Sequence, residues 1–446
     1  MEKKSLHFSF KFTAIALLFL NCTKFGKATR GPSPSLGKGT WQLLLNNTGV
    51  VAMHMALTHY NTVIMFDQIE SGQSGFRFSH RHNGTRCRNT REDLEDSSCY
   101  AHSVEYDVLR NKIRPLHIET DTWCSSGSFL SNGTLIQTGG YGHGARRIRY
   151  LEPCAHGHNC DWKQTKRLLS DDRWYASNQI LPEHDQIIVV GGRRVFSYEF
   201  VPRLSSNRFK SYDLPFLHNT YDKNEGGNNF YPIIHLSSDG HLFIFANRNS
   251  ILFNYKINKV AKTFPRIPGN GSRSYPSTGS SVILPLSHTD RFERVEVMIC
   301  GGASSDAYSA AQHGRFLPGL TSCGRMEITD THSGMYLIRP NSGYSNGNEG
   351  VGYGKEFSVH FLLRNTRPRN VVFTAYAPPF TTHSISMNQR MLTLRCRNLV
   401  RAANGLINAQ LEAPPNPNVA PSGYYMLTVV NDGIPSVSQW VRFIHA

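Results

Sequence analysis

The chain has 446 residues, a formal net charge of +16, only 18% charged residues, 11% aromatics and 37 glycines. This composition favours a turn-rich β protein and argues against a helical one, which would carry more Glu, Lys and Ala. The lysines and arginines are scattered and form no recognition motif, which disfavours nucleic acid as a partner. The length is sufficient for two domains with a large core.

Residues 1–29 are interpreted as a secretory signal peptide. Lys3 and Lys4 precede the apolar run Phe12–Leu20, which is too short to span a membrane, and no second run of spanning length follows. The sequence therefore predicts a secreted protein, extracellular or in the cell wall. A secreted chain of this charge would adhere to acidic cell-wall polysaccharide, although solubility alone is the simpler explanation of the charge.

The nine cysteines suit the oxidising compartment that a signal peptide implies. Cys22 lies at the edge of the signal. Neighbours in sequence tend to pair in such a compartment, although the sequence does not prove connectivity. The candidate disulfides are Cys87–Cys99, Cys154–Cys160 and Cys300–Cys323. Cys124 and Cys396 are left over, and Cys396 is interpreted as an inert thiol. Four N-x-Ser/Thr sequons predict a glycosylated surface: Asn46, Asn83, Asn132 and Asn270.

A repeated phrase organises the first three quarters of the chain. The first apolar strands are expected at Val50–Leu57 and Asn61–Phe66, after the polar stretch Gly31–Thr40. A turn, a buried strand and a small terminal pair then recur at Asn132–Gly140, His184–Gly192, Asp239–Asn247 and Arg294–Gly302. The ends of this phrase are 52, 55 and 55 residues apart, a period typical of kelch-type β-propeller blades. With the first strands counted, five blade-like units lie between residues 45 and 325.

The pattern changes after residue 330. Residues 331–354 are rich in Gly, Asn and Ser and are interpreted as a linker. Residues 355–446 alternate apolar and polar side chains between Pro-rich turns, as in a small β-sandwich. Strands are expected at Phe357–Leu363, Val371–Tyr376, Met391–Leu394 and Tyr424–Val430. The predicted fold class is all-β, with a kelch-type propeller over residues 38–330 followed by an immunoglobulin-like sandwich.

Three phrases carry a family resemblance: Trp123–Gly127 (WCSSG), Asp172–Ala176 (DRWYA) and Pro379–Arg390 (PFTTHSISMNQR). Together with Gly423–Leu427 and Pro435–Val437 they resemble the copper-radical oxidases. The plant glyoxal oxidase (aldehyde oxidase) group is the nearest match, and galactose oxidase is a more distant one. The resemblance runs from about residue 38 to the C-terminus.

The resemblance implies a seven-bladed propeller, an early set sandwich and one copper ion held by two tyrosines and two histidines. Cys124 matches the cysteine whose sulfur is joined by a thioether to the radical-bearing tyrosine, and Tyr175 matches that tyrosine, which also ligates copper. His383 matches a histidine ligand that reaches into the propeller. The implied reaction converts a small aldehyde, O₂ and water into a carboxylic acid and H₂O₂. Oxygen and imidazole ligands suit Cu(II).

Each of these residues also has an ordinary structural explanation. Cys124 beside a tryptophan is consistent with a small buried hydrophobe. Tyr175 beside Trp174 is consistent with core packing between blades. His383 in a Thr/Ser-rich loop is consistent with a surface or hydrogen-bonding histidine. Only the family resemblance favours the catalytic interpretation.

The chain departs from the family where the remaining ligands belong. In the family a Tyr-His dipeptide of a late blade supplies them, and this sequence contains none. Only the fourteen residues Arg325–Ile338 follow the fifth unit, where two further blades need about 100. His332, Tyr336 and Tyr344 lie in this connector and its continuation, but nothing in the sequence fixes them on the propeller axis. An incomplete copper site and impaired oxidation are therefore predicted. The alternatives are a non-catalytic wall or matrix carbohydrate-binding relative, or the product of a gene model missing two blades.

Overall fold

The computed structural model describes most of the chain after residue 41. The described residues are 42–69, 72–80, 84, 86–87, 99–155, 158–203, 210–329, 340–341, 350–362, 368, 370–402 and 405–445. The chain divides into two compact units, residues 1–44 and 45–446, and all the described strands belong to the second. Several predictions lie outside the described residues: the signal peptide, Cys22, the sequon at Asn83, and His332, Tyr336 and Tyr344.

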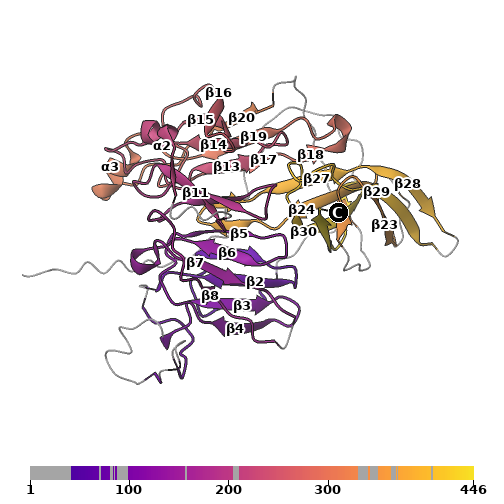
Figure 1. Cartoon of the computed structure of the whole chain (residues 1–446), viewed down its shortest axis with the longest axis horizontal. Coiled ribbons are helices and arrows are strands. Elements are labelled where there is room, and N and C mark those ends of the chain that lie inside the picture. The colour runs from indigo at the N-terminus through magenta and orange to yellow at the C-terminus, as the bar shows by residue number, and fades with distance from the viewer. Residues whose placement is uncertain are drawn as a thin grey trace, which may run out of the picture. The chain divides into compact units, whose positions relative to one another are not determined.

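Three consecutive antiparallel sheets of four strands confirm the predicted repeat (Figure 1). The repeated phrase forms the second strand of each sheet, where β-branched and aromatic residues follow a turn. The second sheet in the chain comprises β5 (Ser126–Phe129), β6 (Leu135–Thr138), β7 (Ile148–Leu151) and β8 (Lys163–Gln164). The third comprises β9 (Ser177–Ile180), β10 (Ile187–Val190), β11 (Ser197–Val201) and β12 (Tyr212–Asp213). The fourth comprises β13 (Ile233–Leu236), β14 (Leu242–Ala246), β15 (Asn249–Asn254) and β16 (Lys259–Thr263).

The first and fifth sheets complete the five predicted blades. The first contains β1 (His54–Leu57), β2 (Thr62–Phe66), β3 (Ser103–Asp107) and β4 (Lys112–Leu116), and β1 begins later than predicted. The fifth has three strands, β17 (Gly279–Ile283), β19 (Glu296–Gly301) and β20 (Cys323–Glu327). The short helices between strands are α2 (Pro215–Thr220), α3 (Ala307–Gln312), and the 3-10 turns η3 (Gly142–Gly144) and η4 (His288–Asp290).

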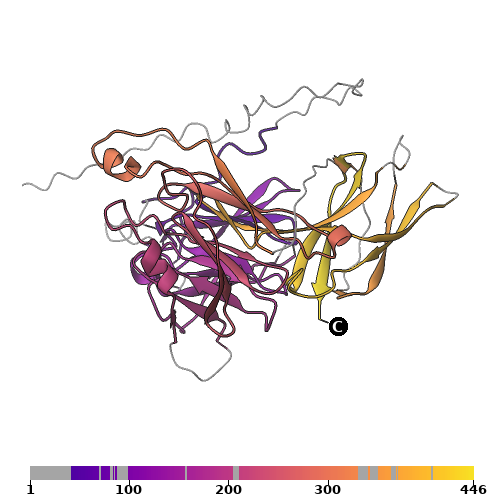
Figure 2. The ribbon, with the colours of Figure 1, turned by 90° about the horizontal axis from the view of Figure 1, so that it is seen from above.

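The C-terminal part forms the predicted sandwich, drawn in orange to yellow in Figures 1 and 2. One sheet contains β23 (Glu356–Phe361), β29 (Ile407–Glu412) and β28 (Cys396–Arg401). The other contains β18 (Leu286–Ser287), β27 (Arg390–Leu394), β24 (Val372–Ala377), β30 (Gly423–Asn431), β31 (Ile434–Pro435), β21 (Pro340–Asn341), β22 (Val351–Gly352) and β32 (Gln439–Ile444). The sequence analysis did not predict β28, β29 or β32, nor the short strands β21 and β22.

A hairpin that follows β24 lies at the centre of the propeller. Its strands are β25 (Phe380–Thr382) and β26 (Ile385–Met387), and β25 extends the first sheet by pairing antiparallel with β1. β25 also contacts β5, while β26 contacts β9, β13 and β17. The hairpin therefore touches the innermost strand of all five sheets. A Cβ atom on Gly127 of β5 would lie 2.5 Å from the ring of Phe380, so this close approach requires glycine.

The three predicted disulfides are present, and they join Cys87 to Cys99, Cys154 to Cys160, and Cys300 to Cys323. Cys124 is a buried free thiol and Cys396 is half-buried. The sequon asparagines Asn46, Asn132 and Asn270 are exposed. No helix in the described part of the chain has the length and apolar character of a membrane span.

Candidate functional site

Three residues from successive sheets enter the site in the same backbone conformation. Cys124, Tyr175 and Tyr231 each lie two residues before the innermost strand of their sheet, with φ values of 52°, 66° and 46°. The Tyr175 amide donates to the Cys124 carbonyl at 2.9 Å, and the Tyr231 amide donates to the Tyr175 carbonyl at 2.8 Å. A positive φ is uncommon for bulky residues, and such strained residues gather at functional sites. These backbone hydrogen bonds connect the residues that precede the innermost strands of three neighbouring sheets, at one end of the propeller.

His383 forms the turn of the central hairpin, also with a positive φ of 53°. Its Nε2 lies 3.5 Å from the Cys124 sulfur, and its Nδ1 lies 2.8 Å from Thr382 Oγ1. Part of the residue reaches solvent, while burial of the rest lowers the pKa of His383 to about 4. The imidazole is therefore neutral at pH 7, which is the form that binds metals.

Tyr175 lies at the centre of an aromatic cluster. Its ring stacks against Phe230 at 5.3 Å and Tyr275 at 5.1 Å between centroids, and it meets Tyr231 edge-on. The Cys124 thiol and the Tyr275 phenol are among the polar groups close to its hydroxyl. Burial raises the pKa of the Tyr175 phenol, and it raises the pKa of the Cys124 thiol to about 12. A protonated thiol beside a neutral imidazole is a poor nucleophile, which argues against cysteine–histidine hydrolase chemistry.

Sequence reasoning missed two further tyrosines beside His383. The ring centroids of Tyr231 and Tyr275 lie 5.2 Å and 5.0 Å from that of His383. Tyr231 is fully buried and donates its hydroxyl to the Ser125 carbonyl at 3.0 Å, while Tyr275 is half-buried. A signal was present, because each heads a Tyr-Pro dipeptide shortly before the first strand of a blade.

His54 is a second imidazole near the site, and it too was missed. It is completely buried on β1, and burial together with His383 lowers its pKa to about 3. Its Nδ1 lies 3.3 Å from the Phe66 carbonyl and its Nε2 lies 3.4 Å from Ser125 Oγ. Both ring nitrogens thus have partners within the fold, so His54 is not an open metal ligand.

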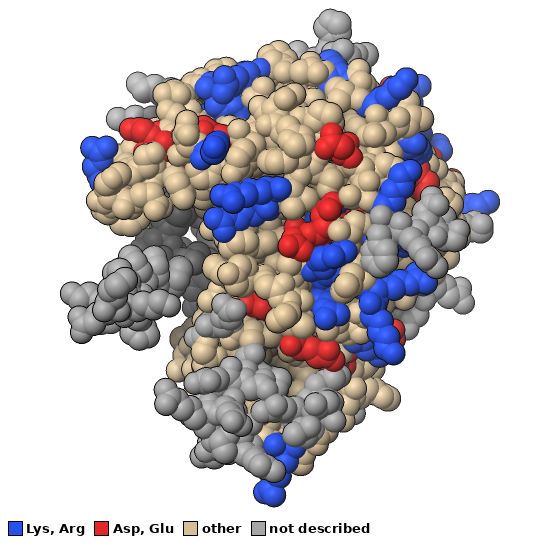
Figure 3. Space-filling view, turned by 60° about the vertical axis from the view of Figure 1, so that its left-hand side comes forward, with Lys and Arg blue, Asp and Glu red and all other residues tan. Residues whose placement is uncertain are grey.

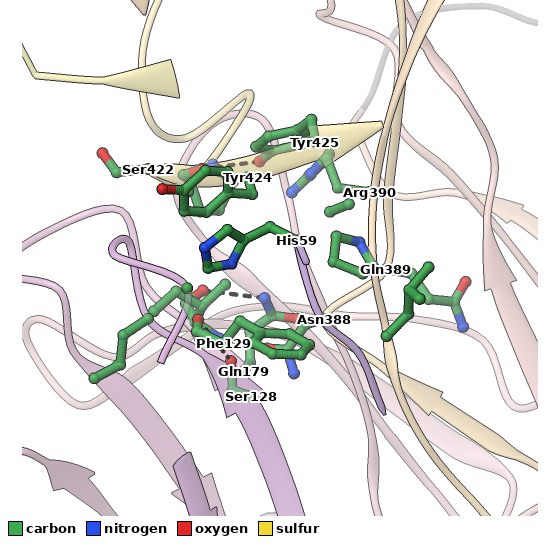
Figure 4. Close-up of a pocket in the computed structure, with 18 residues that line it drawn as sticks. His59, Ser128, Phe129, Gln179, Asn388, Gln389, Arg390, Ser422, Tyr424 and Tyr425 are labelled. Atoms are coloured by element: carbon green, nitrogen blue, oxygen red, sulfur yellow. Dashed lines mark hydrogen bonds between the residues drawn. The ribbon is translucent and has the colours of Figure 1, made fainter. Parts of the chain in front are cut away.

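A cavity is lined by residues of both the propeller and the sandwich (Figure 4). It is lined by His59, which stacks on Tyr424 at 4.0 Å, and by the buried Arg390, which donates to the Leu236 carbonyl at 2.7 Å. Desolvation lowers the pKa of Arg390 to about 10 and that of His59 to about 4. None of Cys124, Tyr175 or His383 lines this cavity. Its polar groups hold the sandwich against the blades.

The donors at the site do not match the ligand set of a copper-radical oxidase. Two imidazoles and two phenols are required by the resemblance, and the sequence has no Tyr-His dipeptide to supply the second pair. Among the described residues, no three His, Cys, Asp or Glu side chains gather in a way that could hold a metal ion. The cluster offers one open imidazole, His383, surrounded by phenols and a thiol.

Five sheets around one hairpin, followed by a sandwich, define the class of galactose-oxidase-like proteins. The sequence matches the description "Glyoxal oxidase N-terminus" over residues 53–337 and "Galactose oxidase-like, Early set domain" over residues 339–443. The chain belongs to the glyoxal oxidase family.

Its relatives include plant proteins named for aldehyde oxidation. The chain is 32% identical to "Aldehyde oxidase GLOX" of Vitis pseudoreticulata, over 91% of this chain and 97% of that protein. It is 32% identical to "Aldehyde oxidase GLOX1" of Arabidopsis thaliana, over 91% and 85% respectively. A solved fungal alcohol oxidase of the AA5 family, in complex with copper, shares the fold with a TM-score of 0.51. That similarity extends over 89% of this chain and 98% of the oxidase at 13% identity.

The relatives are longer than this chain. The match to the Vitis protein extends over 523 residues, which exceeds the 446 residues of the whole chain. That relative therefore carries residues with no counterpart here.

Proposed function

We propose that this chain is a secreted protein of the aldehyde-oxidase type and that Cys124, Tyr175 and His383 form its site. The family reaction converts an aldehyde, O₂ and water into a carboxylic acid and H₂O₂, so a small aldehyde is the proposed substrate. The observation that carries the proposal is the convergence of these side chains, since Cys124 and His383 are separated by 259 positions yet approach to 3.5 Å. The relatives named aldehyde oxidase support the same substrate class.

Each residue would hold one part of a copper-radical site. His383 would offer the lone pair of a neutral imidazole, and Tyr175 would offer a phenol close to the Cys124 thiol, to which a thioether would join it. Because two of the family's four ligands are missing, no catalytic step through copper is assigned to this chain. Aldehyde oxidation is expected to be impaired.

A peroxide-coupled assay tests this proposal. The full chain is loaded with copper and assayed with methylglyoxal, beside a full-length relative treated in the same way. The expected rate is lower than that of the relative by about 100-fold or more, because weakening even the supporting groups of a metal site costs 10–100-fold. A rate within tenfold of the relative would contradict the impairment.

The thioether provides a second measurement at the same site. Its formation in this family depends on copper, so the cross-link is expected to be absent from the purified protein. Peptide mapping should recover the Cys124 peptide as an alkylatable thiol, separate from the Tyr175 peptide. A single cross-linked species that has lost two hydrogens would show that the site can still assemble.

The proposed domains follow the sequence pattern. They are a signal peptide over 1–29, a shortened kelch-like propeller over 38–330, a linker over 331–354 and an early set domain over 355–446. The strands β21 and β22 within the linker pair with the sandwich strands β31 and β32. Glycans are proposed at the four sequons, three of which are exposed asparagines.

Binding to acidic cell-wall polysaccharide is the second candidate function. The net charge is +16, and Lys and Arg are spread over the face drawn in Figure 3 with fewer acidic residues between them. A pull-down on pectin at low and at high salt tests this function. Binding at low salt that disappears at high salt is expected from an electrostatic mode, and binding that survives high salt would contradict it.

The shortened propeller itself can be tested at the level of the transcript. Sequencing across Asp330–Arg339 decides whether the chain is expressed as written. A continuous read through this region supports an impaired protein. A read that enters a Tyr-His segment would restore the expectation of full activity.

A further inference from the structure

Arg390 is a buried cation for which the described part of the chain provides no carboxylate partner. The residue begins β27 and is only 3% exposed, and its Nη2 donates to the Leu236 carbonyl at 2.7 Å. Its Nε and Nη1 are buried and have no hydrogen-bond partner in the described structure. Burial lowers the pKa of Arg390 only to about 10, so the guanidinium is charged at pH 7. A positive charge therefore lies inside the fold without a compensating negative group.

The other large buried arginines are compensated more fully. Arg173 is as buried as Arg390, and its guanidinium forms an ion pair with the buried Glu199 at 3.0 Å. Arg149 donates from both of its terminal nitrogens to several protein oxygens, including the Gly139 carbonyl at 2.8 Å. A buried charge without a partner is strongly unfavourable, as is a buried N–H group without an acceptor. Arg390 therefore requires a partner that the described side chains do not supply.

The cavity lined by Arg390, His59 and Tyr425 provides room for such a partner (Figure 4). Its volume is about 40 Å³, and a single water molecule needs about 10–15 Å³ on this measure. The space therefore accommodates a few water molecules or one small ion. Its lining residues His59, Ser422 and Tyr424 are only half-buried, so solvent reaches the cavity.

The lining residues carry no negative charge of their own, since none of them is Asp or Glu. Burial raises the pKa of the Tyr425 phenol, and its hydroxyl donates to the Pro421 carbonyl at 2.8 Å. Tyr425 is therefore neutral at pH 7. His59 is neutral as well, because desolvation lowers its pKa to about 4. The net charge around the cavity is thus the single positive charge of Arg390.

We propose that this cavity binds one small monovalent anion of the size of chloride, which accepts hydrogen bonds from the Arg390 guanidinium. Water would satisfy the free N–H groups but would leave the buried charge uncompensated. One anion of unit charge does both, whereas a divalent anion would leave a buried negative charge in its place. The proposal goes beyond the oxidase-type function, and it does not depend on that function.

The anion would bind at the base of the central hairpin. Asn388 directly follows β26 and fixes this base, because it accepts from the Ile180 amide at 2.6 Å and donates to the Gly127 carbonyl at 3.0 Å. Arg390 lies two residues further along and reaches Leu236 at the end of β13. Neutralising Arg390 would therefore stabilise the segment through which the sandwich inserts its hairpin into the propeller.

Chloride-35 nuclear magnetic resonance of the full chain tests the proposal directly. The protein is purified in sodium gluconate, whose anion is too large for the cavity, and is then titrated with sodium chloride. Saturable broadening of the chloride resonance is expected, and bromide should reverse it by competition. In a crystal soaked with bromide, one anomalous peak is expected beside the Arg390 guanidinium.

Two matched variants locate the ion. Arg390→Met removes the charge but keeps an apolar chain, and it should weaken chloride binding at least tenfold. Arg442→Met is the control, because Arg442 lies over the ring of Tyr424 at 5.5 Å but does not line the cavity. It should leave the chloride affinity within twofold. Near-ultraviolet circular dichroism checks that both variants are folded.

Urea unfolding provides a second measurement, which needs only the unchanged chain. At constant ionic strength, each tenfold rise in chloride above the dissociation constant should raise the folding equilibrium constant about tenfold, because the anion binds the folded form alone. Replacement of gluconate by chloride without any such rise would contradict the proposal.

The other results that would overturn it are equally specific. Absence of saturable broadening would mean that water alone fills the cavity. Broadening that persists in folded Arg390→Met, or a bromide peak elsewhere, would reject Arg390 as the binding group. Chloride binding neither requires nor produces peroxide, so this inference and the proposed function can fail separately.

Discussion

The fourth and fifth sheets of the propeller differ in how they are covered. Every residue of β13 and β14 is buried. Along β14 the side chains alternate between two cores, with Phe243 packed among the residues of the fifth sheet and the sandwich, and Ile244 packed among those of the third sheet. This alternation is what a strand with neighbours on both faces requires.

The fifth sheet is buried on one face only. Val297 and Ile299 of β19 point into the core shared with Phe243. The registers of β17, β19 and β20 place another set of side chains on the opposite face, which we call the bare face. It comprises Ser280, Val282, Met298, Cys300, Cys323 and Arg325, all half-buried or exposed. Among the described residues no further sheet covers this face, whose side chains are polar (Ser280, Arg325), cross-linked (Cys300, Cys323) or apolar (Val282, Met298).

The largest loss of stability is expected when a core side chain of the fourth sheet is truncated. Phe243→Ala should lower the free energy of unfolding by about 3–5 kcal/mol, because a fully buried phenyl ring is lost and a cavity remains. Urea unfolding followed by tryptophan fluorescence measures this loss. A loss below about 1 kcal/mol would mean that the fourth sheet is no better packed than the bare face.

Removal of the disulfide on the bare face is expected to cause the next largest loss of stability. Replacing both Cys300 and Cys323 by Ser is expected to cost about 3 kcal/mol, since the bond closes a loop of 23 residues between β19 and β20. The matched control replaces Cys154 and Cys160, whose separation is 6, and is expected to cost about 2 kcal/mol. The same unfolding assay compares the two double variants. The reverse order would show that the fifth sheet does not depend on its cross-link.

Much of this architecture could be predicted from the sequence, because local patterns carry it. The repeated phrase predicted the second strand of four sheets. The WCSSG, DRWYA and TTHS phrases predicted that Cys124, Tyr175 and His383 belong to one site. The pairing of β25 with β1 could not be predicted, because it joins segments more than 300 residues apart. Tyr231 and Tyr275 were missed because only the folded sheets show that the residues preceding their innermost strands lie together at one end of the propeller.

A buried histidine between the two sheets should make their contact sensitive to pH. His235 of β13 lies 3.0 Å from Ser281 Oγ of β17, and its burial lowers the pKa to about 3, with Arg390 contributing. The folded protein therefore binds fewer protons at this site than the unfolded chain, whose histidine titrates near 6.5. This contribution to stability is complete above pH 6.5 and is lost as pH falls toward 3, by about 1.4 kcal/mol per pH unit.

Comparison with a variant isolates the His235 contribution from the other titrating groups. Urea midpoints measured between pH 7 and pH 4 should fall less steeply for His235→Asn than for the unchanged chain. His54, whose pKa is also lowered to about 3, contributes equally to both proteins and so cancels. Parallel slopes would show that His235 accepts a proton without disturbing the contact between the sheets.

The smallest effect is expected on the bare face itself. Val282 is 36% exposed and lies opposite Met298 in the register of β17 and β19. Val282→Ser should change the free energy of unfolding by less than about 1 kcal/mol, because its side chain already contacts water in the folded chain. Urea unfolding at two protein concentrations measures this change. A loss above 2 kcal/mol that depends on concentration would mean that a second copy covers the bare face in solution.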